Sequence, residues 1–477
     1  MKVSLVARAL ILSAALGLAG CVTVGPHYLA PELKAPAKWQ QLDDKGATQT
    51  TAAEDYDLSQ WWLSLKDPLL SDLIEQALSA CPDLLSAQAR LRESRARRSV
   101  AAADRLPSVT ASGSAARSRS SEKSGSGSTS NLFSAGFDAS WELDVFGGVR
   151  RSVEAAAADL DASQATLQGV QVTLAAEVAQ IYVELRTLQK RLGIARDNLA
   201  SQSETLQLTQ WRAQAGLVST QDVEQARSNS EQTRAQIPTL ETSLVQAEHR
   251  LDLLLGQTPG TLHERLSTKA GELPLLPLQV AVGIPAETLR QRPDVRGAER
   301  KLAAETARVG VAEAARYPSF KLSGSIGLEA LTLGGVAGAS AAKYSLLGGI
   351  AAPIFDAGKL RSQVAIQDAV REQAQVAYEQ SVLTALQEVE NALVALSRNQ
   401  EREKALKSAS TAALSAAEMA RQRYSAGLID FQSVVDTERN VLSVEDSLAG
   451  TRGDGVLALI ALYKALGGGW RHEGESK

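Results

Sequence analysis

The sequence has very few of the residues that most often carry catalysis or bind metals: 2 cysteines and 4 histidines among 477 residues. The histidines are scattered, and no two of them stand at the spacing of a metal site. They are His27, His249, His263 and His472. No phosphate-binding loop, nucleophile elbow or zinc motif is present. We therefore predict that the chain is not an enzyme and has no catalytic residues, no cofactor and no metal site.

The sequence also has few thiols and a small net charge. With Cys21 and Cys81 as the only cysteines, the chain has neither a disulfide framework nor a thiolate cluster for a metal. The 50 basic and 54 acidic residues give a formal charge of −4, which favours neither nucleic acid nor an acidic surface as a partner. Met1 and Met419 are the only methionines, so no methionine-rich copper track is visible.

The N-terminus has the pattern of a targeting signal. Lys2 and Arg8 give a positive start, and residues 9–18 form an apolar stretch too short to span a bilayer. Leu-Ala-Gly then precedes Cys21, as in a lipobox, where the thiol receives a diacylglycerol. We predict a cleaved signal peptide at 1–20 and lipidation of Cys21. The alternative is an ordinary signal with a chance cysteine.

The residues after the cysteine indicate which membrane the lipid anchor attaches to. Val22 stands where an aspartate would retain a lipoprotein in the inner membrane, so the expected address is the outer membrane. Residues 21–60 contain three spaced prolines and read as an extended, lipid-anchored segment.

The rest of the chain contains one unit twice. Residues 81–108 (CPDLLSAQARLRESRARRSVAAADRLPS) align without a gap with residues 292–319 (RPDVRGAERKLAAETARVGVAEAARYPS) at a separation of 211. The same separation relates Gly147 to Gly358, and a constant separation indicates tandem duplication. The predicted divisions are repeat 1 at 61–257, a linker at 258–285, repeat 2 at 286–468 and a C-terminal tail at 469–477.

Each repeat begins with a helix that ends at a proline, after which the hydrophobic period changes to two. Residues 132–144 alternate most clearly between apolar and polar, residues 319–329 do the same, and 108–116 and 343–354 are weaker versions. In the last segment Tyr344, Leu346, Ile350 and Ile354 share one face.

Four such strands of about ten residues match the lipid-facing and water-facing alternation of an outer-membrane barrel. A soluble, half-buried sheet shows the same alternation and remains the alternative. The aromatic residues predicted to face the membrane are Phe133, Phe137, Trp141, Phe320 and Tyr344.

Long helices follow the strands. From about 149 to 211, leucine-class residues recur every seven positions in two series, which predicts a left-handed coiled-coil seam. The helix should end near Gly216 and return from about 219 to 255. The second copy repeats this from Gly358 to Tyr424 and from about 430 to 466.

Four strands are too few to enclose a channel, since even small barrels need about eight. Unpaired strand edges are excluded in lipid, because every backbone group there must find a partner. We therefore predict oligomerisation, and two, three or four copies satisfy the arithmetic. The predicted fold is mainly helical with a membrane β part, built from a duplicated unit.

Several motifs together resemble one family. They are Val24-Gly25-Pro26 after the lipobox, the Trp61-Trp62 pair, RPDV at 292–295, Tyr317-Pro318 before a strand, PIFDAGKLR at 353–361 and LYKALGGGW at 462–470. Over nearly the whole mature chain the sequence is similar to the outer membrane factors, the TolC-type channel-tunnels, in the lipoprotein branch that serves drug-efflux pumps of Gram-negative bacteria.

The resemblance implies a homotrimer, with a twelve-stranded barrel in the outer membrane continued by a helical tunnel across the periplasm. It also implies three kinds of partner: outer membrane lipid, a periplasmic adaptor (membrane fusion) protein, and an inner-membrane efflux pump that supplies the energy. Transport through the chain itself would be passive.

In that family the tunnel closes at its periplasmic tip. By position, the resemblance assigns Asp436 to the gate aspartate and Arg439 to a neighbouring arginine. Gln432, one turn earlier, stands where related channels often have leucine, so the predicted gate depends on Asp436. Three aspartates around a threefold axis would repel one another and attract cations. The alternative is an Asp436–Arg439 i,i+3 pair on a solvated helix, worth about 0.2–0.5 kcal/mol.

Two turns would form the tip that meets the adaptor. They are Ala215, Gly216 and Leu217 in the first copy and Ala426, Gly427 and Leu428 in the second. A role as simple helix breakers is compatible with this.

The predicted function is a passive exit duct for drugs or other small molecules in a tripartite efflux system. One alternative keeps the fold and changes the cargo, to secreted protein or exported metal. The other is a structural coiled-coil lipoprotein without a pore.

Overall fold

The structure, a computed structural model, describes residues 23–32, 35–40, 50–52, 58–268, 270–277, 280–282 and 285–470. The predicted signal peptide and Cys21 lie outside the described residues. The chain forms two compact units, and each takes segments from both repeats. The first unit comprises Met1–Glu32, Arg90–Gln164 and Gly297–Gln380, and the second Leu33–Ala89, Ala165–Arg296 and Ser381–Lys477. The duplication is therefore one of sequence, while the compact units are built jointly by both copies.

The helices of the two repeats match in length. α3 (Pro82–Ala103) and α8 (Pro293–Ala314) have 22 residues, α4 (Gly148–Gln214) and α9 (Lys359–Ser425) have 67, and α5 (Thr220–Leu254) and α10 (Phe431–Ala465) have 35. Each pair begins 211 positions apart, which is the separation found in the sequence. The predicted long helices and their return helices are confirmed.

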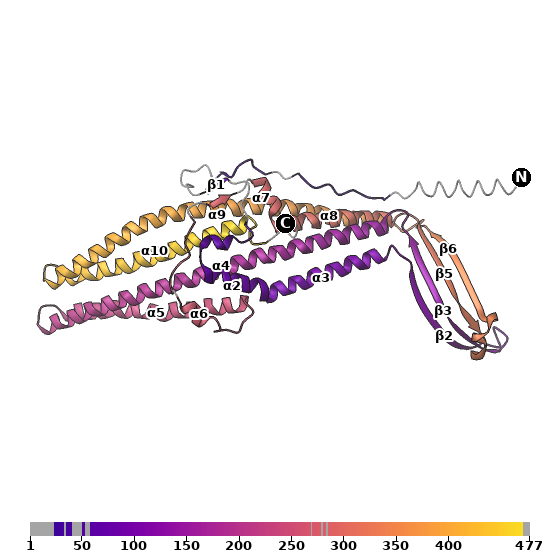
Figure 1. The fold of residues 1–477 in the computed structure, drawn as a ribbon, viewed down its shortest axis with the longest axis horizontal. Helices are drawn as coiled ribbons and strands as arrows, with labels where there is room; N and C mark the ends of the chain where they lie inside the picture. The colour runs from indigo at the N-terminus through magenta and orange to yellow at the C-terminus, as the bar shows by residue number, and fades with distance from the viewer. Residues whose placement is uncertain are drawn as a thin grey trace. The chain divides into compact units, whose positions relative to one another are not determined.

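Antiparallel helix pairs characterise the second unit (Figure 1). Arg196 on α4 pairs with Glu241 on α5 at 2.7 Å. Arg452 on α10 pairs with Glu403 on α9 at 3.0 Å. In each copy the long helix and its return helix therefore lie side by side, as a coiled-coil seam requires.

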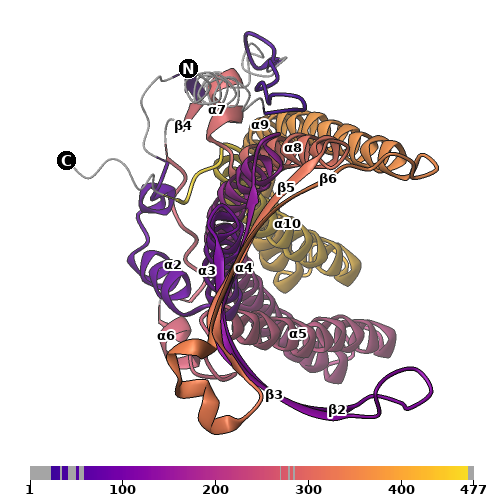
Figure 2. The same ribbon diagram turned by 90° about the vertical axis from the view of Figure 1, so that its right-hand side faces the viewer.

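The first unit contains a four-stranded antiparallel sheet in the order β2-β3-β5-β6. The strands are β2 (Ser108–Arg119), β3 (Thr129–Leu143), β5 (Ser319–Ala330) and β6 (Ala342–Ala351). Short 3₁₀ turns, η3 (Leu333–Ala337) and η4 (Ala339–Ala341), connect β5 to β6. The four strands bend together into one curved ribbon (Figure 2). The prediction that Ile354 belongs to the last strand was wrong, because β6 ends at Ala351 and a turn follows.

Each long helix is started by an aspartate just after the sheet. Asp144 accepts hydrogen bonds from the backbone N–H groups of Val149 and Arg150 at 3.0 and 2.9 Å. Asp356 does the same for Gly358 and Leu360 at 2.9 and 2.8 Å. These bonds satisfy N–H groups that a helix start leaves without an intrahelical partner.

The Val-Gly-Pro motif fixes the N-terminal segment to the first unit. Arg151 is buried and donates to the carbonyl oxygens of Val24 and Gly25 at 3.2 and 3.1 Å. Gly25 has a φ of +87°, and a Cβ there would lie 2.4 Å from the Cα of Gly310. Only glycine allows both this backbone conformation and this close approach.

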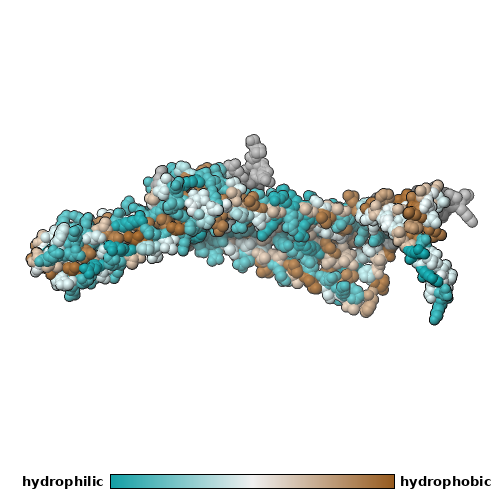
Figure 3. Space-filling model, turned by 90° about the horizontal axis from the view of Figure 1, so that it is seen from below, coloured by the Kyte–Doolittle hydropathy of each residue, from teal (hydrophilic) through white to brown (hydrophobic). Residues whose placement is uncertain are grey.

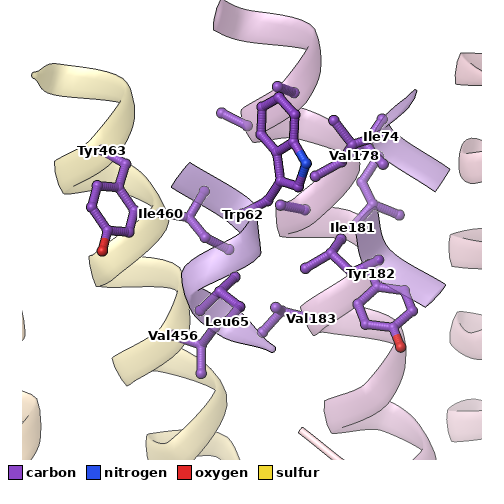
Figure 4. Close-up of a cluster of buried hydrophobic side chains, with 14 of the residues drawn as sticks. Trp62, Leu65, Ile74, Val178, Ile181, Tyr182, Val183, Val456, Ile460 and Tyr463 are labelled. Atoms are coloured by element: carbon purple, nitrogen blue, oxygen red, sulfur yellow. The ribbon is translucent and has the colours of Figure 1, made fainter. Parts of the chain in front are cut away.

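The largest core among the described residues lies in the second unit and includes the tryptophan pair. Figure 4 shows the part of this core around Trp62. Trp61 and Trp62 lie in the 3₁₀ helix η2 (Trp61–Leu65), which precedes α2 (Pro68–Ala80). Trp61 stacks on Tyr463 of α10 with ring centroids 5.3 Å apart. Apolar side chains of α2, α4 and α10 fill the remaining space. The tryptophan pair therefore joins the start of the first repeat to the last helix of the second.

Two further sequence motifs meet beside this core. Arg292, of the RPDV motif, donates to the carbonyl oxygen of Ala465 at 2.7 Å and to Glu388 at 2.7 Å. Gly467, with a φ of +79°, packs against the Arg292 backbone. The arginine therefore binds the end of α10, where helix carbonyls lack partners. The predicted linker also contains α6 (His263–Ser267), β4 (Val280–Val282), which pairs in parallel with β1 (Thr50–Ala52), and the start of α7 (Pro285–Gln291).

On the face drawn in Figure 3, hydrophilic and weakly polar residues cover most of the helices, and hydrophobic residues form scattered patches. Across the described residues, no helix combines the length and apolar character needed to cross a membrane.

Candidate functional site

The two predicted tip turns have the same backbone construction. Gly216 and Gly427 both have a φ of +73°. The N–H groups of Leu217 and Leu428 each donate a 2.9 Å bond to the carbonyl five residues earlier, in Arg212 and Arg423. This is the Schellman arrangement, in which a left-handed glycine ends a helix. Leu217 and Leu428 are 68% and 70% exposed, so both turns present an apolar side chain to solvent.

The return helices begin directly after these turns with side-chain caps. Ser219 forms a capping box with Asp222 at the start of α5. Asp430 accepts from the Ser433 N–H at 3.0 Å at the start of α10. In each helix pair, the glycine turn and the side-chain cap together account for the sharp reversal of the chain between the long helix and its return helix.

The predicted gate residues lie on the first turns of α10. Gln432 and Asp436 are exposed, and the Gln432 amide donates to an Asp436 carboxylate oxygen at 2.8 Å. Arg439 instead reaches α5, where its Nε donates to Asn229 Oδ1 at 2.8 Å. Among the described residues no ion pair joins Asp436 to Arg439, so the alternative of an i,i+3 pair was wrong. The structure brings Gln432 and Asp436 together and directs Arg439 to a neighbouring helix.

An aromatic cluster that the sequence did not single out supports this end of α10. Tyr424, Phe431, Val434 and Val435 are buried together. The Arg212 guanidinium lies 4.5 Å from the centroid of the Tyr424 ring and also donates to the Tyr424 backbone carbonyl. A cation over an aromatic ring is attracted by its quadrupole. Arg212 on α4 therefore connects the first tip turn to the second.

A buried carboxylate lies close to the exposed one. Glu438 is buried on the opposite side of α10 and accepts from Thr205 Oγ1 of α4 at 2.7 Å. Arg421 of α9 donates to Ser201 Oγ of α4 at 2.6 Å and lies near enough to favour the Glu438 charge. Burial nevertheless dominates and raises the pKa of Glu438 above its usual value. The sequence signal that could have identified Glu438 is a glutamate within the heptad pattern of α10, close to the buried valines Val434 and Val435.

In the first unit, the predicted aromatic residues lie on the apolar face of the sheet. Phe137, Ile326 and Tyr344 are cross-strand neighbours on β3, β5 and β6, and they are 57%, 65% and 87% exposed. Phe133 and Trp141 share their face on β3. The middle of this face is therefore not covered by any other part of the described chain.

The remaining aromatic residues lie near the helical end of the sheet. The Trp141 indole donates to the Arg105 carbonyl at 3.0 Å. The ring centroids of Phe320 and Phe146 are 6.4 Å apart. Phe146 also stacks on Tyr317, with ring centroids 4.7 Å apart. Indoles that combine an apolar face with a satisfied N–H are typical of a membrane boundary.

Among the described residues, no group of three or more histidine, cysteine, aspartate or glutamate side chains is placed to hold a metal ion. His263 Nδ1 lies 3.0 Å from Glu248 Oε2, and this contact raises the pKa of the exposed imidazole.

Comparison with known proteins gives consistent matches over both repeats. A family model described as outer membrane efflux protein matches residues 73–257 and 284–468. Nodulation protein T of Rhizobium leguminosarum bv. trifolii is 34% identical over 458 residues, 95% of each chain. Cation efflux system protein CusC of Escherichia coli O6:H1 is 30% identical over 457 residues, 96% of this chain and 97% of that protein. The solved structure of the outer-membrane channel OprN matches with a TM-score of 0.87 and 38% identity, over 94% of this chain and 99% of that one.

Proposed function

The chain belongs to the outer membrane efflux protein family and is an outer membrane channel of an efflux system; from this premise we propose that three copies form one duct, which is closed at its periplasmic end when idle. The duct is passive and catalyses no reaction. The energy for export comes from an inner-membrane pump, to which a periplasmic adaptor connects the duct.

The observation that carries this proposal is the open-edged, curved sheet with an uncovered apolar face. The outer edges of β2 and β6 pair with no strand among the described residues. A soluble half-buried sheet would cover its apolar face, whereas Tyr344 and its cross-strand neighbours are largely exposed. In lipid an apolar face is favourable but an open strand edge is not. Pairing of β6 in one copy with β2 in the next removes the edges and, with three copies, gives a twelve-stranded barrel.

We propose that lipid also holds the N-terminus, through an acylated Cys21. The support is the lipobox in the sequence. The buried contacts that Arg151 makes with Val24 and Gly25 fix the chain only a few residues after the proposed anchor. Two or more acyl chains give stable membrane attachment.

The gate, as we propose it, consists of Asp436 on an α10 held in place by its neighbours. Gln432 orients the Asp436 carboxylate, Arg439 links α10 to α5, and the cluster around Tyr424 fixes the turn before α10. With three copies, three exposed carboxylates face one axis, where they narrow the passage with their hydration and attract cations. The exposed leucines of the two tip turns are the proposed contacts of the adaptor.

The cargo is proposed to be drugs or other small molecules. Metal ions are the second candidate, favoured by the relative whose name is cation efflux system protein. A duct that accepts cargo from a pump needs no metal site of its own, so the same architecture serves either cargo. Protein secretion has no specific observation in its favour.

The test is the native mass of the full-length protein in mild detergent, combined with conductance in planar bilayers. A trimer that conducts, with subunits starting at an acylated Cys21, is the expected result. A stable monomer, or a trimer without conductance, contradicts the shared barrel. A mature start at another residue, or an unmodified Cys21, contradicts the anchor alone.

A further inference from the structure

The apolar face of the four-stranded sheet carries charge at one place only. Successive residues of a strand point to opposite faces, and the pairing register places Arg117 and Arg119 of β2 on the same face as Phe133 and Phe137. These two arginines are the only charged residues that the four strands place on this face, and the face has no carboxylate. The other charged residues of the strands stand on the opposite face, and they are Asp138, Glu142, Lys321, Glu329 and Lys343.

The two arginines lie just beyond the apolar band of the sheet. On β3 this band runs from Leu143 to Phe133, which is ten residue steps. At about 3.4 Å per step the band is roughly 34 Å long, and a strand tilt of about 40° reduces its height to roughly 26 Å, close to the ~25 Å apolar band of an outer-membrane barrel. Arg117 pairs with Asn131, the next position of this face past Phe133. Its side chain therefore stands at the level of the lipid headgroups.

The leaflet follows from the direction of the strand. β2 starts at Ser108, shortly after α3, and ends at Arg119, so the arginines are at the end of the sheet away from the helices (Figure 1). The inference rests here on the proposed function, in which the helices form the periplasmic part of the duct. The opposite end of the barrel then faces the cell exterior, and the arginines meet the outer leaflet. A charge there is tolerated far better than one at the bilayer midplane.

The protein supplies no full counter-charge to this pair. Arg119 lies 3.5 Å from Glu122, but both side chains are largely exposed, at 68% and 79%. Arg117 is exposed, and no carboxylate in the described part of the chain pairs with it. In the proposed barrel β6 of the next copy lies beside β2, and the connection before β6, residues 331–341, contains neither aspartate nor glutamate. The counter-charge must therefore come from outside the protein.

We propose that Arg117, assisted by Arg119, is a binding site for the phosphate group of an anionic lipid in the outer leaflet. The guanidinium fork matches the oxygens of a phosphate, with which it forms two parallel charge-assisted hydrogen bonds. The acyl chains of the same lipid cover the apolar face below, around Phe133 and Phe137, of which Phe137 is 57% exposed. Three such sites, one in each copy, fix the height of the barrel in the membrane.

The test compares two lipids that differ only in the phosphate: dimyristoyl phosphatidate and dimyristoyl glycerol. Each is titrated into the detergent-purified full-length protein, and bound lipid is measured by native mass spectrometry. The phosphatidate is expected to bind at least about tenfold more tightly, and an equal concentration of inorganic phosphate should not displace it, because free phosphate makes no contact with the apolar face.

Arg117→Gln is expected to remove most of this preference. It should leave the melting temperature unchanged, because Arg117 is exposed; should it not form trimers, Arg119→Gln takes its place. Lys343→Gln is the matched control, because it loses the same charge from the opposite face, where Lys343 pairs with Glu329 at 2.7 Å. The control should keep the wild-type preference.

The outcomes separate this proposal from the duct itself. A wild-type protein that is not a trimer contradicts the shared barrel, and the lipid site falls with it. A trimer that binds both lipids equally overturns the lipid site alone. So does a preference that survives the arginine substitution, one that Lys343→Gln reduces as much, or displacement of the phosphatidate by inorganic phosphate.

Discussion

Removing the acceptor of the α5–α10 contact should open the tip. In Asn229→Ala, Arg439 loses the oxygen to which its Nε donates at 2.8 Å. Arg439 is an exposed side chain, so its guanidinium can return to water without a large penalty. The substitution therefore weakens the hold of α5 on the first turns of α10 and leaves the charge of Arg439 in place.

The size of the effect follows from the kind of bond. A hydrogen bond with one charged partner contributes about 1.5–3 kcal/mol, and water access reduces this to about 1 kcal/mol here. In a trimer the three equal contacts sum to about 3 kcal/mol when the tip opens as one unit. Since about 1.4 kcal/mol changes an equilibrium tenfold, the ratio of open to closed channels should rise roughly a hundredfold.

The assay is the open probability of single trimers in planar bilayers, with antibiotic uptake by cells that carry the variant as a second readout. Ser228→Ala is the matched control, because Ser228 is an exposed neighbour on α5 whose side chain forms no hydrogen bond with the described residues. Native mass and melting temperature show whether each variant is a folded trimer. An Asn229→Ala trimer that opens no more often than Ser228→Ala would refute the reasoning.

Four further outcomes are expected. Asp436→Ala should raise the resting conductance and reduce cation preference in bilayers; a conductance equal to that of the wild type would remove Asp436 from the gate. Glu438 gives a pH dependence of definite sign. Burial raises its pKa in the described structure. We take this conformation as that of the closed tip, which then gains stability that is fully present below the ordinary carboxyl pKa and is lost as the pH rises through the raised value. Conductance should therefore increase with pH, and Glu438→Gln should hold it at the low-pH level; a Glu438→Gln channel with the wild-type profile contradicts this. Trp61→Ala removes a buried ring stacked on Tyr463, and calorimetry should show a loss of about 3–5 kcal/mol, whereas a loss below about 1 kcal/mol would contradict the central role of that core. Gly25→Ala places a Cβ 2.4 Å from a backbone carbon of α8 and should therefore speed proteolysis of the N-terminal segment. Equal rates of cleavage in the variant and the wild type would contradict this.

Much of the fold could be predicted from the sequence because its signals are local or repeated. The separation of 211 between the copies predicts the matched helices, and all three helix pairs begin at that separation. Alternation along 132–144 predicts a strand, since side chains point to opposite faces in turn. Glycines at 216 and 427 end the long helices because they adopt a left-handed conformation. Hydrophobic period and turn residues act within a few positions, so they can be read directly from the chain.

The duplication was a poorer guide to detail. Asp144 and Asp356 both start a long helix, yet they are 212 positions apart rather than 211. The two copies therefore reached the same cap from neighbouring positions. Likewise, the alternation after residue 343 suggested that Ile354 extends the last strand, but the pairing of β6 with β5 stops at Ala351. Where a strand ends depends on its partner and not on its own pattern.

The sequence by itself determined the duplicated helical architecture, the two-faced strands and the position of the exposed aspartate at the tip. Only the tertiary structure decided which side chains meet: that Arg439 binds Asn229 and not Asp436, that Glu438 is buried against α4, and that the buried Gln202 side chain has no hydrogen-bond partner among the described residues. These contacts join residues more than 200 positions apart or depend on how three helices pack. Their geometry is set by the relative rotation and register of the helices, and no periodicity within one helix specifies it.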